Sequence, residues 1–148
     1  MSKPMSGNTL EISVTNDLRG ISSAASRIDA FCTAHGLASG ISFDVTLAVD
    51  ELVTNTIGYG YDDDGEHRID LALRVEGGAL TVEIADDGRA FDPLQAPEPD
   101  MSAPMEDRAG GGLGIYLVRK TMDTVAYRRE NGRNVVTLTK SAMPGEAS

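Results

Sequence analysis

The stretch Ala-Val-Asp-Glu-Leu-Val-Thr-Asn at residues 48–55 carries the first signal of the fold and of a site. Its apolar residues continue a stripe that begins at Val45 and recurs at helical spacing, which predicts an amphipathic helix. Glu51 and Asn55 are four residues apart, so both project from one side of that helix, at the rim of the core. A carboxylate there can take a proton from a nucleophile, and a carboxamide oxygen can bind Mg²⁺. Taken alone, the pair is more typical of the polar edge of an amphipathic helix.

A second cluster, Asp86-Asp87-Gly88-Arg89-Ala90, follows an apolar strand pattern. A carboxylate fixed at a strand end can accept a hydrogen bond from the exocyclic amine of a nucleotide base. Gly88 lets the backbone approach a ligand closely, because glycine has no side chain. Asp and Gly are also the usual residues of a turn that ends a strand, so a turn without function is the alternative.

A third cluster, Gly110-Gly111-Gly112-Leu113-Gly114, lies directly before a helical pattern from Ile115 to Met122. Free backbone N–H groups that lead into a helix N-terminus form an anion site, so we expect phosphate binding here, with a flexible hinge as the alternative. The cluster lacks the Gly-Lys-Ser/Thr of a Walker A loop. It also lacks the regular βαβ unit of a dinucleotide-binding fold.

The remaining patterns predict an α+β protein. We expect a two-layer sandwich with helices on one face of a mixed, mainly antiparallel sheet. Between residues 91 and 108 the periodicity is lost and four prolines occur, which is typical of a functional or disordered loop. The predicted strands cover 10–14, 69–75, 80–84, 124–130 and 134–140, and the predicted helices cover 17–35, 115–122 and a segment that starts at Gly40 or Ser42.

Size and charge limit the classes of function. The chain has 148 residues, which suits one domain over 1–148, with loose tails expected at 1–8 and 142–148. Its formal net charge of −10 disfavours binding to nucleic acid and to anionic membranes. No stretch approaches the roughly 20 apolar residues of a membrane span, and no signal peptide is apparent, so we expect a cytoplasmic protein.

Together the three clusters resemble the N, G1 and G2 boxes of the Bergerat ATPase/kinase superfamily, which includes gyrase, histidine kinases and mismatch-repair ATPases. The resemblance covers about residues 9–140. The sequence resembles the anti-sigma factor serine/threonine kinases more closely still. Three segments carry this resemblance: residues 48–55, residues 112–123 (Gly-Leu-Gly-Ile-Tyr-Leu-Val-Arg-Lys-Thr-Met-Asp) and residues 127–134 (Tyr-Arg-Arg-Glu-Asn-Gly-Arg-Asn). The resemblance implies the Bergerat ATP-binding fold with ATP and Mg²⁺ as cofactors.

The resemblance also implies a role for each matched position. Glu51 corresponds to the catalytic base, Asn55 to the Mg²⁺ ligand, and Asp86 to the residue that binds the adenine amino group. Residues 91–109 correspond to a lid over ATP; because the lid contains no lysine, contacts to the γ-phosphate fall to Arg108 or to the cation. Ala90 stands where glycine is common. The positions implied to bind the nucleotide are Asn55, Asp86, Gly88, Ala90, Arg108, Gly110, Gly111, Gly112, Leu113 and Gly114.

The function implied by the resemblance is a protein serine/threonine kinase and binding switch. Such a protein phosphorylates a serine of a STAS-type antagonist and sequesters a sigma factor or another effector. A homodimer is compatible with the resemblance. The alternatives are an ATP-dependent binding module without phosphotransfer and a detached histidine-kinase catalytic domain. The last is disfavoured because Glu51 stands where histidine kinases usually have Asn, and because no helical segment with a phosphoacceptor histidine precedes the boxes.

Overall fold

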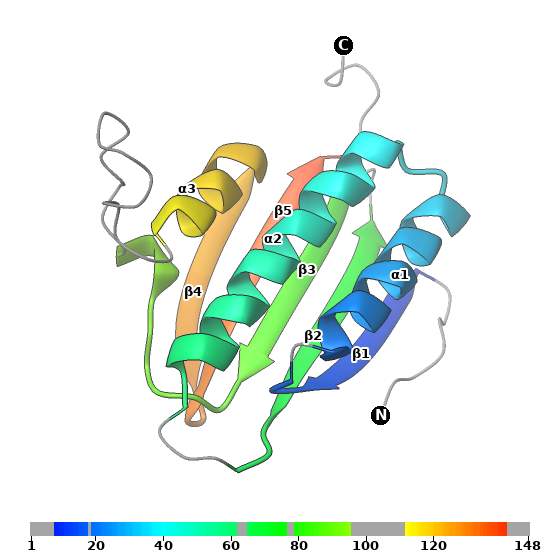
Figure 1. Cartoon of the computed structure of the whole chain (residues 1–148). Coiled ribbons are helices and arrows are strands. Elements are labelled where there is room, and N and C mark those ends of the chain that lie inside the picture. Colours follow the sequence, from blue (N-terminus) through cyan, green and yellow to red (C-terminus); the bar gives the residue numbers. More distant parts are fainter. Residues whose placement is uncertain (1–7, 18, 62–64, 77–78, 96–111, 142–148) are drawn as a thin grey trace.

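The computed structural model describes residues 8–17, 19–61, 65–76, 79–95 and 112–141. These residues form two layers: a five-stranded sheet, and helices that cover one face of it (Figure 1). The predicted α+β sandwich with helices on one side is therefore confirmed. None of the described helices combines the length and the apolarity needed to cross a bilayer.

The sheet has the strand order β1-β2-β3-β5-β4. Its four pairings are all antiparallel, so the described strands contain no parallel pair of the kind that a mixed sheet would have. Each observed strand includes its predicted range. The strands are β1 (Thr9–Thr15), β2 (Arg68–Glu76), β3 (Ala79–Asp86), β4 (Thr124–Glu130) and β5 (Arg133–Ser141).

The last two strands are joined by the predicted turn at Asn131-Gly132. Both residues have positive φ angles, 54° and 77°. This is the combination that a two-residue hairpin turn of the primed type requires, and an Asn-Gly pair adopts it at low cost. The turn sets the register of β5 against β4. In the separate pairing of β5 with β3, Asn134 lies opposite Asp86.

Four helical segments are described: α1 (Arg19–Ala34), α2 (Ser39–Tyr59), the short 3₁₀ turn η1 (Pro93–Gln95) and α3 (Gly112–Thr121). Asp17 accepts a hydrogen bond from the backbone N of Arg19, in agreement with its predicted capping role. The predicted start of α2 at Gly40 or Ser42 was late, because the hydroxyl of Ser42 donates to Asp29 of α1 instead of capping α2. The predicted start of α3 was also late, since the helix already begins at Gly112.

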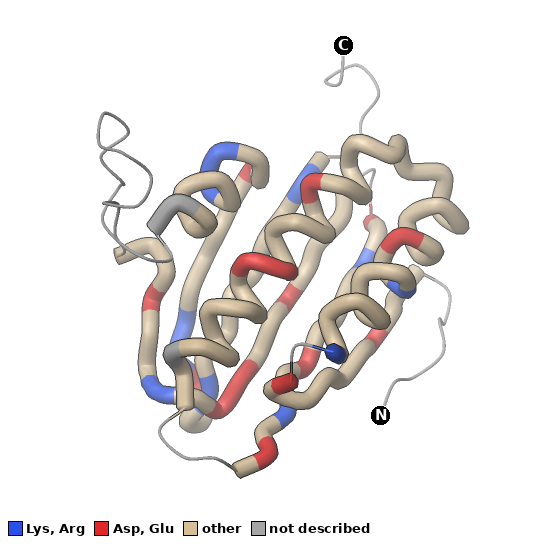
Figure 2. The backbone as a smooth tube through the Cα atoms, in the orientation of Figure 1, with Lys and Arg blue, Asp and Glu red and all other residues tan. Residues whose placement is uncertain are grey.

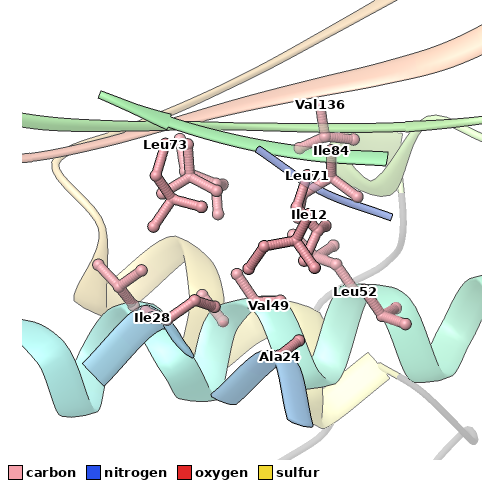
Figure 3. Close-up of a cluster of buried hydrophobic side chains, with 14 of the residues drawn as sticks. Ile12, Ala24, Ile28, Val49, Leu52, Leu71, Leu73, Ile84 and Val136 are labelled. Atoms are coloured by element: carbon pink, nitrogen blue, oxygen red, sulfur yellow. The ribbon is translucent and has the colours of Figure 1, made fainter. Parts of the chain in front are cut away.

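The core lies between the helices and the sheet. Figure 3 shows Ala24 and Ile28 of α1 and Val49 and Leu52 of α2 facing apolar residues of the strands, among them Leu71. The predicted stripe on α2 is buried, and α2 lies over the middle of the sheet (Figure 1). The core therefore fixes the rotation of α2, and this rotation leaves one edge of the helix half-buried beside α3.

Several predictions fall on residues outside the described ranges. The tail at 1–8 is described only at residue 8, and the tail at 142–148 is not described. Of the lid at 91–109, the structure describes residues 91–95, which contain η1. The single-domain assignment is compatible with the one hydrophobic core that the described elements share.

The core assignment predicts a large difference between two phenylalanines. Phe31 of α1 is fully buried, whereas Phe43 of α2 is 67% exposed. Phe31→Ala should lower the free energy of unfolding by about 3–5 kcal/mol, because it removes buried area and leaves a cavity. Phe43→Ala, the matched control, should change it by less than about 0.5 kcal/mol. Urea unfolding followed by circular dichroism measures both, and equal losses would contradict this core.

Candidate active site

The half-buried edge of α2 carries Glu51 and Asn55 on successive turns. The carboxylate of Glu51 lies directly against Gly114 in the first turn of α3. A Cβ atom built on Gly114 would overlap Oε2 of Glu51 and lie 2.8 Å from its Cδ. Only glycine leaves room for the carboxylate at this position, so the first and third sequence clusters meet here.

Asn55 carries a buried amide group at the same edge. Its Nδ2 has no hydrogen-bond partner among the residues that the structure describes. A buried amide without a partner is costly in a folded protein, and such groups usually belong to a site that a ligand completes. The same side chain offers an amide oxygen, a ligand type that suits a hard cation such as Mg²⁺.

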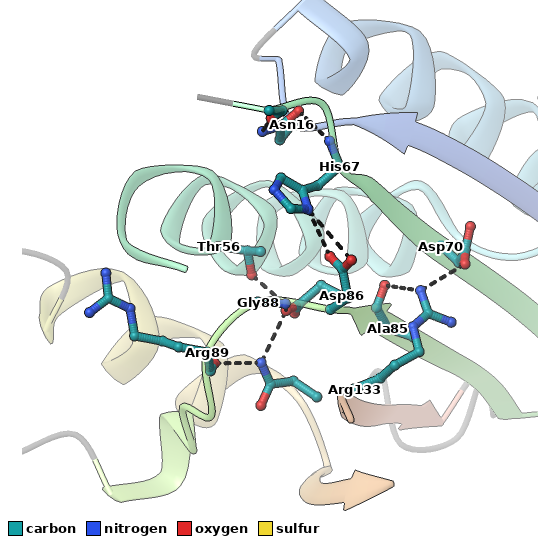
Figure 4. A network of polar contacts seen from close by, with 12 residues as sticks. Asn16, Thr56, His67, Asp70, Ala85, Asp86, Gly88, Arg89 and Arg133 are labelled. Atoms are coloured by element: carbon teal, nitrogen blue, oxygen red, sulfur yellow. Dashed lines mark hydrogen bonds and ion pairs between the residues drawn. The ribbon is translucent and has the colours of Figure 1, made fainter. Parts of the chain in front are cut away.

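Asp86 ends β3 and is 6% exposed. Its Oδ1 accepts two hydrogen bonds, from the backbone N of Gly88 at 2.8 Å and from Nδ2 of Asn134 at 3.0 Å. Its Oδ2 lies 3.5 Å from the hydroxyl of Thr56 on α2 (Figure 4). The single proton of that hydroxyl has a closer acceptor in the carbonyl of Leu52, at 3.1 Å. Oδ2 therefore keeps the capacity to accept a hydrogen bond from a ligand.

Asp87, the neighbouring carboxylate, faces another way and is exposed. Its Oδ1 lies 3.2 Å from Nδ1 of His67, and the His67 ring stacks on Tyr61 with the centroids 4.1 Å apart. Figure 4 shows His67 and Asp86 in the same region of the sheet end. The two adjacent aspartates thus differ in surroundings, and of the two, Asp86 is the one buried against α2.

Tyr61 follows the end of α2 and has a buried hydroxyl without a partner among the described residues. Burial raises the pKa of Tyr61, and the negative charges of Asp86 and Asp87 raise it further, while Arg133 opposes them. The phenol is therefore neutral at physiological pH and retains its proton. Close to Asp86 it is a second donor without a partner among the described residues, and no pattern in the sequence singles it out.

The turn after β3 rests on the end of α2. A Cβ atom on Gly88 would lie 2.7 Å from the carbonyl oxygen of Gly60, and the backbone N of Arg89 donates to the same oxygen at 2.8 Å. The approach of Gly88 to a ligand stays a prediction; the structure shows a close approach of Gly88 to the protein's own backbone. This contact joins the second sequence cluster to the helix that carries the first.

The β4–β5 hairpin supports the same turn from the other side. Nη1 of Arg129 donates to the carbonyl of Gly88 at 2.9 Å. Arg128 and Arg129 are both exposed, as is typical of a solvated strand edge. Arg128 forms exposed ion pairs with Glu83 and Glu130, whereas Arg129 also bonds to the turn after β3. Figure 2 shows basic residues gathered at this end of β4 and β5, so the net negative charge of the chain is offset locally.

The remaining predicted site residues divide into three groups. Ala90 is exposed in the turn after β3. Gly112, Leu113 and Gly114 form the first turn of α3 and do not precede it, so the backbone N–H groups that the helix cannot pair belong to these residues. Arg108, Gly110 and Gly111 lie outside the described residues.

The chain belongs to the family described as the histidine kinase-like ATPase domain, which it matches over residues 14–140. It is 32% identical to the serine/threonine-protein kinase BtrW of Bordetella bronchiseptica over 143 residues, which cover 93% of this chain and 95% of that protein. It is 29% identical to the serine-protein kinase RsbW of Bacillus subtilis, with 70% of this chain and 71% of that protein covered. The anti-sigma F factor of Clostridium acetobutylicum is 29% identical, with 66% and 67% covered. The predicted resemblance to anti-sigma kinases is therefore confirmed.

Two solved structures share the fold. The RsbU and RsbW domains of a Mycobacterium tuberculosis protein match with a TM-score of 0.65 and 17% identity, over 90% of this chain and 32% of that one. The blue-light activated histidine kinase EL346 of Erythrobacter litoralis matches with a TM-score of 0.55 and 20% identity, over 76% of this chain and 34% of that one. Both support the two-layer fold of the ATPase domain.

The described residues fit the ATP that this family uses, and they fit Mg²⁺ as its counterion. Asp86 has a free acceptor oxygen, which suits the exocyclic amine of adenine. The amide oxygen of Asn55 suits a cation, whereas its buried Nδ2, which has no partner among the described residues, is a donor and suits an acceptor such as a phosphate oxygen. The N–H groups in the first turn of α3 have no acceptor within the helix itself, which suits phosphate.

The contact between Gly88 and Gly60 gives a prediction about stability. Gly88→Ala should destabilise the fold by about 1–3 kcal/mol, because the new methyl group meets a backbone carbonyl that cannot move freely. In the control Gly58→Ala, nothing lies within 4 Å of the new methyl group. The control should be neutral or stabilising by up to about 1 kcal/mol, since alanine favours the helix. Urea unfolding of the two variants checks this, and a neutral Gly88→Ala would show that the contact is not tight.

Proposed function

We propose that this chain is an ATP-dependent protein serine/threonine kinase that acts as an anti-sigma-type switch. It transfers the γ-phosphoryl group of ATP to a serine of a STAS-type antagonist protein. When the antagonist is not available, it sequesters a sigma factor or another effector. The proposal is supported by family membership and by relatives that are named protein kinases and an anti-sigma factor.

The observation that carries the kinase assignment is the position of the Glu51 carboxylate. It lies against Gly114, in the turn of α3 proposed to hold the phosphates, and one helical turn from Asn55. A serine hydroxyl is a weak nucleophile until a base takes its proton, so a carboxylate beside the phosphate site is suited to general-base catalysis. A module that only binds ATP has no need of a base at this position.

The other residues of the site bind and orient the nucleotide. Asp86 accepts a hydrogen bond from the adenine amine through Oδ2, and the amide oxygen of Asn55 binds the cation. Backbone N–H groups of Gly112–Gly114 bind the phosphates at the N-terminus of α3. When bound, Mg²⁺ neutralises charge on the phosphates, which together with positioning provides most of the catalysis in phosphoryl transfer.

The kinase proposal predicts that the Glu51 carboxylate is needed for transfer and is not needed for binding. Glu51→Gln keeps the shape and removes the base, so single-turnover phosphorylation of the antagonist should slow by about 10²–10⁴. ATP affinity, measured by calorimetry, should change little. Gly114→Ala should have a similar effect, because its methyl group displaces the carboxylate. Gly40→Ala, where the new methyl group meets nothing within 4 Å, is the matched control and should transfer at the wild-type rate.

The chemistry of the product distinguishes the rival functions. Acid-stable phosphoserine on the antagonist supports the kinase. Acid-labile phosphohistidine would favour a detached histidine-kinase domain, and binding of ATP without transfer to any partner would favour a binding module. A Glu51→Gln variant that transfers phosphate at the wild-type rate would exclude Glu51 as the base.

A further inference from the structure

We propose that Asn134 is a positioning residue that makes the site selective for adenine, because it holds Asp86 with only Oδ2 facing the base. The inference rests on the proposed use of ATP and goes beyond it by assigning base selectivity to a residue of β5. Asn134 is 4% exposed and lies in a strand whose next residues, Val135 and Val136, are buried and apolar. A buried polar side chain in that setting needs partners.

Asn134 uses its full hydrogen-bonding capacity. Its Nδ2 donates to Oδ1 of Asp86 at 3.0 Å and to the carbonyl of Arg89 at 2.8 Å. Its Oδ1 accepts from the backbone N of Phe91 at 3.2 Å and from the hydroxyl of Tyr127 at 2.6 Å. The side chain therefore connects three segments: the turn after β3, β4 and β5.

The two backbone partners fix which end of the amide faces Asp86. The N–H group of Phe91 can only donate, so the Asn134 oxygen must lie on its side. The carbonyl of Arg89 can only accept, so the Asn134 nitrogen must lie on the other side. Since Asp86 is on the nitrogen side, its Oδ1 accepts a hydrogen bond from Nδ2 of Asn134. The opposite orientation of the Asn134 amide is excluded.

This arrangement makes the two oxygens of Asp86 different. Oδ1 has two donors, from Asn134 and from the backbone of Gly88, whereas Oδ2 has only the Thr56 hydroxyl at 3.5 Å. The carboxylate is thus held before the base arrives, which reduces the entropy lost on binding. An oxygen that accepts selects an exocyclic amine at position 6 of a purine. Guanine has a carbonyl oxygen there, and two acceptors repel each other.

The test compares ATP with purine riboside 5′-triphosphate, which differs from ATP only by the missing exocyclic amine. Calorimetry with the full chain and Mg²⁺ gives the ratio of the two affinities. Wild type should prefer ATP by about ten- to a hundredfold, the usual effect of a hydrogen bond to a charged group. Asn134→Ala should reduce this ratio of affinities to less than about fivefold, mainly by weakening the binding of ATP.

Two further variants keep the test decisive. Tyr127→Phe removes one hydrogen bond to Asn134 and keeps the ring, so it should lower the ratio by about two- to fivefold even if Asn134→Ala does not fold. Asn8→Ala is the matched control. Its side chain donates to the carbonyl of Val75, at the end of β2 far from Asp86, and its loss should leave the ratio unchanged.

If Asn134 had a merely structural role, Asn134→Ala would weaken the binding of both nucleotides equally. That result would overturn the inference. An unchanged ratio in a folded Asn134→Ala, or a wild type that does not distinguish the two nucleotides, would also overturn it. The kinase proposal fails separately: a wild type that prefers ATP but transfers no phosphate would contradict phosphotransfer and still support the role of Asn134.

Discussion

The contact between the turn after β3 and the C-terminal end of α2 is the constraint on which the site depends. Gly88 has no side chain, so the turn can approach the Gly60 carbonyl closely enough for the N–H group of Arg89 to bond to it. Without this contact Asp86 would end an ordinary strand. With it, the Asp86 carboxylate lies next to the helix that carries Glu51 and Asn55, and this region combines an acceptor for a base, a cation ligand and a proton acceptor.

The core and the site are therefore parts of one arrangement. Burial of the α2 stripe against the sheet sets the rotation of that helix, and this rotation determines where Glu51 and Asn55 point. Gly114 then allows α3 to lie against the Glu51 carboxylate. Both glycines act by leaving space, one for a backbone carbonyl and one for a carboxylate, so each is required for a different reason.

Much of this could be predicted from the sequence, because its signals are local. Alternation predicted the first three strands, and the Asn-Gly pair predicted the hairpin that joins the last two. The role of Asn134 could not be predicted, since it depends on the register that places β5 opposite Asp86, 48 residues earlier in the chain. The contacts of Gly60 and Arg129 with the turn after β3 could not be predicted either, because each joins segments far apart in the chain. An Asn directly before the apolar pair Val135 and Val136 was the only signal, and it becomes meaningful once its partner across the sheet is known.

The central claim is that α2, the end of β3 and the first turn of α3 bind one nucleotide together. A crystal structure of the protein with Mg²⁺ and a non-hydrolysable ATP analogue tests it most directly. The account predicts the adenine amine within hydrogen-bonding distance of Oδ2 of Asp86, the cation on Asn55 and the phosphates at the N-terminus of α3. A nucleotide bound with its base away from Asp86, or a cation held by other residues, would contradict the account.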